Sequence, residues 1–234
     1  MRYKIQVTVM CWLAAIALAA CGNSQATPQP QTTAPNDGFH TQAQSTLAKN
    51  STKIIFLGDS LTAGYGLAQT DAWPEQVQER LKIAGYKTEV VNAGVSGDNS
   101  ANGLARYDWS VGSANADVLV LALGANDFLQ GVSPSKTRKN LQTIIERAQD
   151  DGMQVILAGV ATPQLERLGP IGRSYAEIYP ALAKEYKVLL FPSILDGVIG
   201  RPELLQADGL HPTKAGVEIM ADNFTKYLRT QLKD

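Results

Sequence analysis

Residues 117–123 read DVLVLAL, an apolar run with no polar side chain after Asp117. A strand that is hydrophobic on both faces belongs in the middle of a parallel sheet, where helices cover both sides. The run ends at Gly124, and the polar residues Asn126 and Asp127 follow directly after Ala125. The stretch therefore predicts a central parallel strand with polar side chains at its carboxyl end.

Shorter apolar runs alternate with helical spacing on both sides of this stretch. The other strands are expected at 53–57, 89–92, 153–158 and 188–191. The helices are expected at 73–83, at 134–151 with Ser133 as N-cap, at 173–186 with an interruption near Pro180, and at 213–232. Five strands separated by helices predict an α/β doubly wound fold of three layers, with a flavodoxin-like sheet of five parallel strands flanked by helices.

Polar motifs follow the predicted strands, at the edge of the sheet where such folds bind ligands. GDSLT at 58–62 follows the first strand, NAGVSGD at 92–98 ends the second, and GAND at 124–127 follows the third. DGLHP at 208–212 comes after the fifth strand and before the last helix. We therefore expect these four motifs to converge on one site.

The composition of the 234 residues excludes several classes of function. The 21 basic residues nearly balance the 22 acidic ones, and 44% of the residues are hydrophobic. With no basic stripe to neutralise phosphates, the chain is not expected to bind nucleic acid. Both cysteines, Cys11 and Cys21, precede residue 51, which excludes disulfides, a cysteine nucleophile and thiolate zinc sites from the remainder. Since His40 and His211 are the only histidines, we do not expect a His-rich metal site. We expect no cofactor either.

Residues 1–20 have the pattern of a secretory signal peptide. Arg2 and Lys4 precede an apolar run at 7–20, which is too short to span a bilayer and ends in small residues. A buried N-terminal helix is the alternative. LAAC at 18–21 resembles the bacterial lipobox, which implies cleavage before the cysteine and attachment of lipid to its sulfur. An ordinary secretory signal with an incidental cysteine is the alternative to lipidation.

Residues 21–50 are expected to form a flexible tether that begins at the lipidated Cys21. Gln, Thr, Asn, Ala and Pro dominate this stretch, so it buries too little apolar surface to offset its conformational entropy. His40 lies within it and is expected to be a bystander. By resemblance, Gly22 after the cysteine implies sorting to the periplasmic face of an outer membrane. Residues 51–234 are expected to form the folded domain.

Two of the motifs contain the groups of a serine hydrolase. Ser60 stands on a predicted strand-to-helix turn, which exposes a hydroxyl to a ligand; the alternative is a serine that only caps the helix. His211 follows Asp208 by three residues, so the carboxylate can accept from Nδ1–H and leave Nε2 free to take a proton from a hydroxyl. The alternative for this pair is a helix-capping aspartate beside a surface histidine.

The other two motifs contain groups that can stabilise a negatively charged oxygen. The side-chain N–H of Asn126 suits a developing oxyanion, although asparagine after a strand also forms simple turns. Gly97 offers a backbone amide where any side chain would block approach; a merely flexible turn is the alternative. An activated hydroxyl, a positioned base and oxyanion donors together indicate acyl transfer.

The four motifs, taken in order, resemble those of the GDSL or SGNH hydrolase family, and the resemblance covers residues 52–234. AWP at 72–74 and GLAR at 103–106 resemble the branch of multifunctional acyl-CoA thioesterases, lysophospholipases and arylesterases. The resemblance implies the SGNH hydrolase fold and a serine esterase that hydrolyses carboxylic esters or thioesters of acyl chains through an acyl-enzyme. Its partners would be a small-molecule acyl ester or lipid, and the membrane through its lipid anchor.

The resemblance also implies a role for each residue. Ser60 would be the nucleophile, His211 the general base and Asp208 the group that orients it. The oxyanion hole would consist of the Ser60 and Gly97 amides and the Asn126 side chain. Gly94 competes for the glycine role, but Gly97 stands in the SGD triplet of its motif.

The acyl pocket and the substrate are less closely defined. Residues 128–132 and 159–170 are expected to shape the pocket, with Phe128, Leu129 and Leu165 as its contacts. One alternative is a carbohydrate esterase that deacetylates envelope polysaccharide. Another is a cofactor-binding module, since GYGLAQ at 64–69 begins like a dinucleotide-binding turn, with glutamine in place of the third glycine. A third is a non-catalytic lipoprotein that binds lipid.

Overall fold

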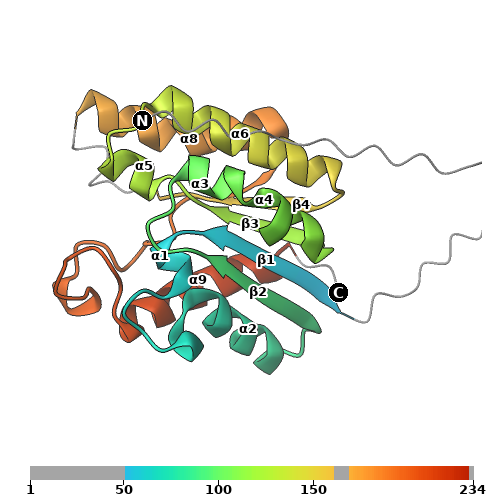
Figure 1. Ribbon diagram of the computed structural model, residues 1–234. Coiled ribbons are helices and arrows are strands. Elements are labelled where there is room, and N and C mark those ends of the chain that lie inside the picture. The colour runs from blue at the N-terminus through green and yellow to red at the C-terminus, as the bar shows by residue number, and fades with distance from the viewer. Residues whose placement is uncertain (1–50, 161–168, 232–234) are drawn as a thin grey trace, which may run out of the picture. The chain divides into compact units, whose positions relative to one another are not determined.

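The computed structural model describes residues 51–160 and 169–231 (Figure 1). Residue contacts divide the chain into two units, Met1–Ser45 and Thr46–Asp234, and the structure below is that of the second. The predicted signal peptide, the tether with Cys21 and the predicted pocket residue Leu165 lie outside the described residues.

Five parallel strands form one sheet in the order β2-β1-β3-β4-β5. The strands are β1 (Thr52–Gly58), β2 (Thr88–Gly94), β3 (Val118–Ala122), β4 (Gln154–Ala158) and β5 (Leu189–Phe191). Every residue of β3 is buried and β3 is the middle strand, as its uninterrupted apolar sequence predicts. The predicted doubly wound sheet of five parallel strands is confirmed.

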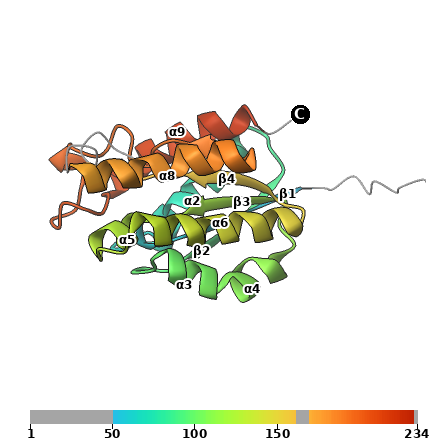
Figure 2. The ribbon, with the colours of Figure 1, turned by 90° about the horizontal axis from the view of Figure 1, so that it is seen from above.

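Helices cover both faces of this sheet (Figure 2). The α-helices are α1 (Ser60–Ala63), α2 (Trp73–Ile83), α3 (Ser100–Ala105), α4 (Tyr107–Ser110), α5 (Ala125–Leu129), α6 (Pro134–Asp150), α8 (Pro170–Tyr186) and α9 (Lys214–Arg229). Short 3₁₀ turns lie at η1 (Gln69–Asp71), η2 (Gly112–Ala114) and η3 (Pro202–Leu204). Because side chains alternate along a strand, Phe56 packs toward α2 and α9 whereas Ile55 packs toward α6 and α8.

Helix α8 departs from the sequence prediction. It begins at Pro170 rather than at 173, and it continues through Pro180 to Tyr186 without the expected interruption. An internal proline removes one backbone hydrogen bond from a helix. Here the helix persists because its inner face is buried against the sheet, with Tyr175 and Tyr179 each only 1% exposed. Tertiary packing outweighs the local preference of the proline.

An aromatic cluster on one face of the sheet connects β1 and α2 to α9, the last helix of the domain. The ring of Phe224 in α9 lies 5.5 Å from that of Phe56 in β1, and 5.1 Å from those of Trp73 in α2 and Phe191 in β5. All three contacts are edge-to-face, which is a favourable geometry for aromatic rings. Phe224 therefore ties α9 to both β1 and α2.

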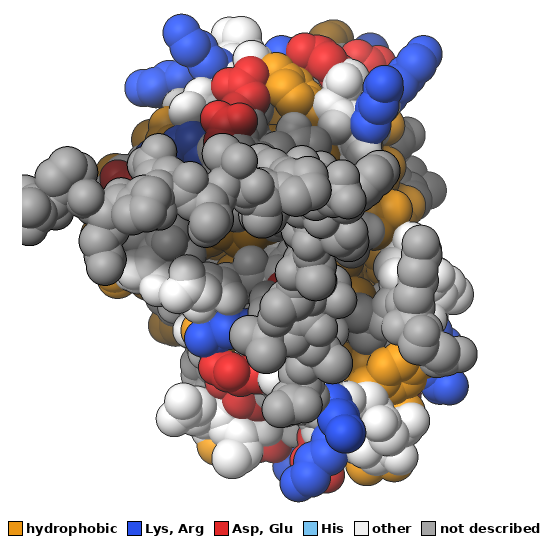
Figure 3. All heavy atoms as spheres, turned by 90° about the vertical axis from the view of Figure 1, so that its right-hand side faces the viewer, with side chains coloured by type: hydrophobic (Ala, Val, Ile, Leu, Met, Phe, Trp, Pro, Cys, Tyr) orange, Lys and Arg blue, Asp and Glu red, His pale blue; other side chains and the backbone are white. Residues whose placement is uncertain are grey.

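The surface carries charges of both signs. On the face that Figure 3 shows, basic and acidic side chains of the described residues lie interspersed. Lys53 pairs with Glu89 across neighbouring strands at 3.1 Å. In the ranges 51–160 and 169–231, no helix combines the length and the apolar character that crossing a membrane requires.

Candidate active site

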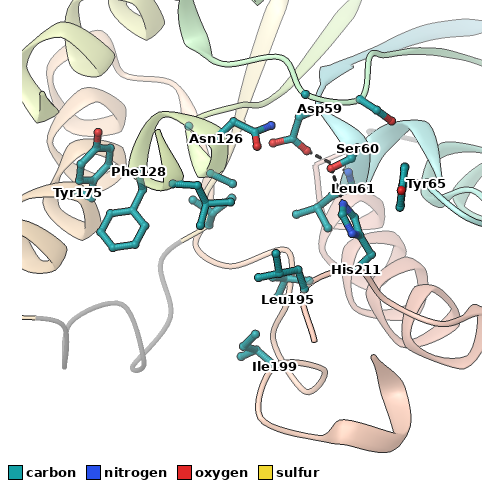
Figure 4. A pocket seen from close by; sticks show the side chains of 17 residues that line it. Asp59, Ser60, Leu61, Tyr65, Asn126, Phe128, Tyr175, Leu195, Ile199 and His211 are labelled. Carbon is teal, nitrogen blue, oxygen red and sulfur yellow. Dashed lines mark hydrogen bonds between the residues drawn. The ribbon is translucent and has the colours of Figure 1, made fainter. Parts of the chain in front are cut away.

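The carboxyl ends of the strands bring the four polar motifs together. Gly58 is in register with Gly94 on one side and with Ala122 on the other, so β1, β2 and β3 end at one level. Ser60, Gly97 and Asn126 follow these ends, and all three line one cavity. His211, from the segment between η3 and α9, lines the same cavity (Figure 4). The predicted convergence at the sheet edge is observed.

Ser60 is the first residue of α1 and does not cap it. The N-cap is Asp59, whose side chain accepts a hydrogen bond of 3.0 Å from the Leu61 amide. The alternative that Ser60 serves only as a helix cap is therefore wrong. Because Asp59 takes the capping role, the Ser60 hydroxyl is free to bond elsewhere.

A chain of two side-chain hydrogen bonds joins Ser60, His211 and Asp208. His211 Nε2 lies 2.8 Å from Ser60 Oγ, and His211 Nδ1 lies 2.7 Å from Asp208 Oδ2. Asp208 Oδ1 accepts the amides of His211 at 3.0 Å and of Leu210 at 2.9 Å. A carboxylate that accepts from Nδ1–H leaves Nε2 as the acceptor for the serine proton.

The pKa of Asp208 is lowered to about 2. The largest cause is the hydrogen bond from the His211 amide, followed by the bond from the His211 ring and the bond from the Leu210 amide. Hydrogen bonds to the charged form favour that form. Asp208 therefore stays ionised throughout the neutral and mildly acidic range.

The groups predicted for the oxyanion hole differ in how they are held. Asn126 Nδ2 donates to the Asp98 carbonyl at 2.9 Å, which orients the amide and leaves its second N–H for a ligand. Gly97 has φ +89°, and a Cβ added there would meet nothing within 4 Å. At Gly94 an added Cβ would lie 2.4 Å from the Ala63 nitrogen. Gly94 thus serves close packing against α1, whereas Gly97 faces the cavity.

Arg106 connects the loops of the site through hydrogen bonds, a role that its sequence context did not indicate. Its Nε bonds Asp98 Oδ2 at 2.6 Å and its guanidinium donates to the Gly58 carbonyl at 3.0 Å. The side chains of Arg106 and Asp98 are 8% and 13% exposed, so this ion pair is largely shielded from water. Asp98 in turn holds Asn126, and Arg106 thereby connects the segments that present Ser60, Gly97 and Asn126. The GLAR motif was its only signal in the sequence.

Asp127 is a second buried residue that holds the site in place, and the sequence pattern did not indicate this role. It is fully buried and accepts the Ser100 amide at 2.7 Å, the Ser100 hydroxyl at 2.5 Å and the Thr137 hydroxyl at 2.9 Å. These bonds tie α5 to α3 and α6. Because Asn126 precedes Asp127 in α5, the same bonds fix the backbone that carries Asn126.

Asp59 is a buried carboxyl beside the hydroxyl and the imidazole. Burial raises its pKa to about 6, and the Leu61 amide and the proximity of His211 offset only part of that rise. The side chain is 1% exposed, so solvent does little to stabilise its charge.

The cavity at this site has a volume of about 600 Å³. The predicted contacts Phe128 and Leu129 line it, and Leu129 is 59% exposed at its mouth. Val160, from the predicted segment 159–170, also lines the cavity, together with Tyr65, Tyr175, Leu195 and Ile199, which no sequence pattern indicated. The ring of Phe128 packs edge-to-face on that of Tyr175 at 5.3 Å. Leu195 and Ile199 come from the segment after β5, which the sequence pattern did not connect with the site.

Metal ligands do not gather in the described residues. Within 51–160 and 169–231, no group of three or more His, Cys, Asp or Glu side chains is arranged to hold a metal ion.

Comparison with known proteins gives consistent matches over most of the chain. The sequence pattern of the GDSL-like lipase/acylhydrolase family matches residues 56–219. Esterase TesA of Pseudomonas aeruginosa is 35% identical over 180 residues, which are 76% of this chain and 89% of that protein. The arylesterase of Vibrio mimicus is 34% identical over 79% of this chain and 94% of its own length. Thioesterase 1/protease 1/lysophospholipase L1 of Escherichia coli is 34% identical over 75% of this chain and 83% of its own length.

Solved structures agree with these sequence matches. The crystal structure of TesA superposes with a TM-score of 0.73 at 35% identity, covering 77% of this chain and all of that one. AlinE4, an SGNH-hydrolase family esterase, superposes with a TM-score of 0.64 at 36% identity, covering 79% of this chain and 98% of that one. The predicted SGNH hydrolase fold is confirmed.

Proposed function

The chain belongs to the GDSL-like lipase/acylhydrolase family, and from this premise we propose how its site hydrolyses esters. Its relatives carry the names esterase, arylesterase and thioesterase/lysophospholipase, so the chain is a GDSL serine esterase that acts on carboxylic esters. In the proposal Ser60 is the nucleophile, His211 the general base and Asp208 the group that orients His211. The observation that carries it is the hydrogen-bonded chain from Ser60 through His211 to Asp208 beside an apolar cavity.

The reaction begins when Ser60 Oγ attacks the acyl carbonyl carbon and His211 Nε2 takes the serine proton. The carbonyl oxygen becomes an oxyanion, which accepts from the Ser60 and Gly97 amides and from Asn126 Nδ2. The carbon–oxygen bond to the alcohol then breaks, and His211 gives its proton to the leaving oxygen. Water, deprotonated by His211, then attacks the acyl-enzyme. The bond between the acyl carbon and Ser60 Oγ breaks, the acid is released, and His211 returns the proton to Ser60 Oγ. Asp208 stabilises the imidazolium that forms in each half of the cycle.

The substrates we propose are esters and thioesters of medium or long acyl chains. Support comes from the cavity, whose lining beyond Ser60 is mostly apolar and includes Phe128, Val160, Leu195 and Ile199. Burying each methylene of an acyl chain against such a surface is favourable by about 0.8 kcal/mol. An acetyl group would leave most of this surface unused.

The test measures kcat/KM of the purified protein on p-nitrophenyl esters from acetate to palmitate. We expect kcat/KM to rise from acetate to medium chains, and Ser60→Ala to lower kcat at least about a thousandfold. Ser113→Ala is the matched control, since Ser113 is an exposed serine on η2 that does not line the cavity. Circular dichroism should show the same fold for both variants. Ser60→Ala with nearly full activity would refute the mechanism.

Other results of the same assay would favour one of the alternative functions. Turnover of the acetate ester alone would favour the carbohydrate esterase, and turnover of none would favour a lipid-binding protein without catalysis. Lysophospholipids and acyl-CoA would then be compared at equal acyl length to separate oxygen esters from thioesters.

We also propose that the protein is exported and held at the periplasmic face of an outer membrane by lipid on Cys21. Support comes from the signal-peptide pattern of residues 1–20, the LAAC motif and Gly22. Cells fed radiolabelled palmitate should label the unaltered protein and the Cys11→Ser control, but not Cys21→Ser. Equal labelling of Cys21→Ser would contradict lipidation at this position.

A further inference from the structure

An aromatic side chain lies against the histidine of the proposed mechanism. The ring of Tyr65 is 4.4 Å from the ring of His211 between centroids, with 36° between the planes. Tyr65 lines the cavity and is 52% exposed, although it is a large aromatic residue. Packing within the fold does not explain the position of Tyr65, because about half of its surface remains exposed to solvent.

The backbone of Tyr65 is held from both sides of the site. Its amide donates to the Ser60 carbonyl at 3.1 Å, and its carbonyl accepts from Gln206 Nε2 at 2.8 Å. The backbone N–H of Gln206 also donates to the His211 carbonyl at 2.7 Å. The flanking residues Gly64 and Gly66 have φ angles of +76° and +74°, which residues other than glycine rarely adopt. The backbone of Tyr65 is thus held close to the segments that carry Ser60 and His211.

The geometry of ester cleavage determines which part of the substrate lies on each side of the cavity. The attacked carbon carries four groups, which are Ser60 Oγ, the oxyanion, the leaving oxygen and the acyl chain. The oxyanion points to Gly97 and Asn126, and the leaving oxygen must approach His211 Nε2 to receive the proton. The leaving group therefore lies on the His211 side, beside Tyr65.

The acyl chain is left with the opposite side. Figure 4 shows Phe128 and Tyr175 on one side of Ser60 and Tyr65 on the other, with His211 next to Tyr65. The ring pair of Phe128 and Tyr175 gives that side an apolar surface that suits an acyl chain. The cavity thus has an acyl side and a leaving-group side.

We propose that Tyr65 forms the subsite for the alcohol part of the ester, and that this subsite favours flat, apolar leaving groups such as aryl or benzyl over small aliphatic ones. The exposed ring of Tyr65 offers a surface on which a second ring stacks, and Leu210, which is 50% exposed, lines the same cavity. The inference rests on the proposed roles of Ser60 and His211. It adds a determinant of leaving-group preference that the mechanism itself does not require.

The test compares two butyrate esters, phenyl butyrate and methyl butyrate, which share the acyl group and differ in the leaving group. Tyr65→Leu should lower kcat/KM for the phenyl ester roughly fivefold to tenfold and change that for the methyl ester less than about twofold. Tyr65→Phe keeps the ring and should match the unaltered protein on both esters. Trp109→Leu is the matched control, because Trp109 is 69% exposed on α4 and does not line the cavity.

Deacylation separates a contact with the leaving group from an effect on His211. The butyryl-enzyme no longer holds the alcohol, but His211 still activates the attacking water. We expect the decay of the butyryl-enzyme after a burst to be unchanged in Tyr65→Leu. Slower decay with equal losses on both esters would overturn the inference and leave Tyr65 as a positioning residue for His211. Unchanged kinetics on both esters would overturn it as well.

A second measurement uses the unaltered protein and needs no variant. Added alcohols compete with water for the butyryl-enzyme and bind where the leaving group was. Benzyl alcohol should capture the butyryl group at several-fold lower concentration than propan-1-ol, and equal capture would overturn the inference. Hydrolysis that persists in Ser60→Ala would instead refute the proposed function on which the inference rests, so the two failures are distinguishable.

Discussion

Two aspartates near the reacting atoms lie in opposite electrostatic environments. Asp208 is exposed on a turn and its pKa is lowered to about 2, first by the His211 amide that it accepts. Asp59 is buried beneath α1, and burial raises its pKa to about 6. The Asp208 carboxylate is therefore charged at neutral and mildly acidic pH, whereas Asp59 changes charge near pH 6.

Replacing Asp208 should remove activity without unfolding the protein. Asp208→Asn keeps the shape but loses the charge that stabilises the imidazolium, so we expect kcat to fall by at least about a thousandfold. The melting temperature should change little because the turn is exposed. Asp222→Asn is the control, since Asp222 pairs with Arg80 on the α2–α9 surface, away from the cavity. A loss of less than about tenfold in Asp208→Asn would contradict the role assigned to this carboxylate.

Asp59 should make stability depend on pH between about 3.8 and about 6. In that range the unfolded chain has lost the proton while the folded protein still holds it, so the free energy of unfolding falls as pH rises. A rise from 3.8 to about 6, at about 1.4 kcal/mol per unit, corresponds to roughly 3 kcal/mol. Urea unfolding at pH 4 and pH 7.5 measures this change.

The comparison variant is Asp59→Asn, whose amide oxygen can still accept the Leu61 bond. Its unfolding free energy should lack the decrease between pH 4 and pH 7.5 that the unaltered protein shows. The same pH slope in both proteins would mean that Asp59 is not the group responsible.

At the scale of elements, one side chain connects three segments of the site. Arg106 bonds the end of β1 and the loop after β2, and through Asp98 it supports Asn126 in α5. The guanidinium fork fixes two directions at once, which a lysine ammonium does not. The loops that present the oxyanion donors thus depend on the Arg106 side chain, which does not line the cavity.

Arg106→Lys should therefore lower kcat by at least about tenfold, with a smaller change in KM, because misplaced donors weaken the transition state. Arg80→Lys is the matched control. Arg80 also bonds a carboxylate and a backbone carbonyl, but it does so between α2 and α9. Ester kinetics and thermal melts of both variants distinguish the two cases. Equal losses of stability with unchanged kcat in Arg106→Lys would show that its role is only structural.

The elements differ in how well the sequence predicts them. β3 and α6 were predicted nearly to the residue, because a long apolar run and a capped periodic helix are local signals. The four-residue helices α1 and α4 were not predicted, since so few residues carry no periodicity. Arg106 and Tyr65 were not recognised either. Their positions depend on contacts with residues up to 141 positions away, such as Gln206, and no local pattern reveals those.

At the scale of the whole molecule, the aromatic cluster of Phe224 and the site occupy different parts of the domain. The site lies at the carboxyl ends of the strands. The aromatic cluster of Phe224 lies on one face of the sheet, and α6 and α8 cover the other face. Phe224 does not line the cavity. A change in the cluster should therefore alter the folded fraction and leave the folded molecules active.

Phe224→Ala should lower the free energy of unfolding by about 3–5 kcal/mol, the cost of removing a fully buried aromatic side chain. Well below the melting temperature, kcat per folded molecule should stay within about twofold. Urea titration and active-site titration measure the two quantities. Ile83→Ala is the control, because Ile83 is 77% exposed and should cost less than about 0.5 kcal/mol. Loss of kcat in proportion to stability would show that core and site are coupled.

The nucleophile and its base are 151 residues apart in the chain, and His211 follows all five strands. The residues of all five strands and Ser60 are therefore synthesised before His211. A nascent chain or a prematurely terminated product carries the hydroxyl without the group that activates it.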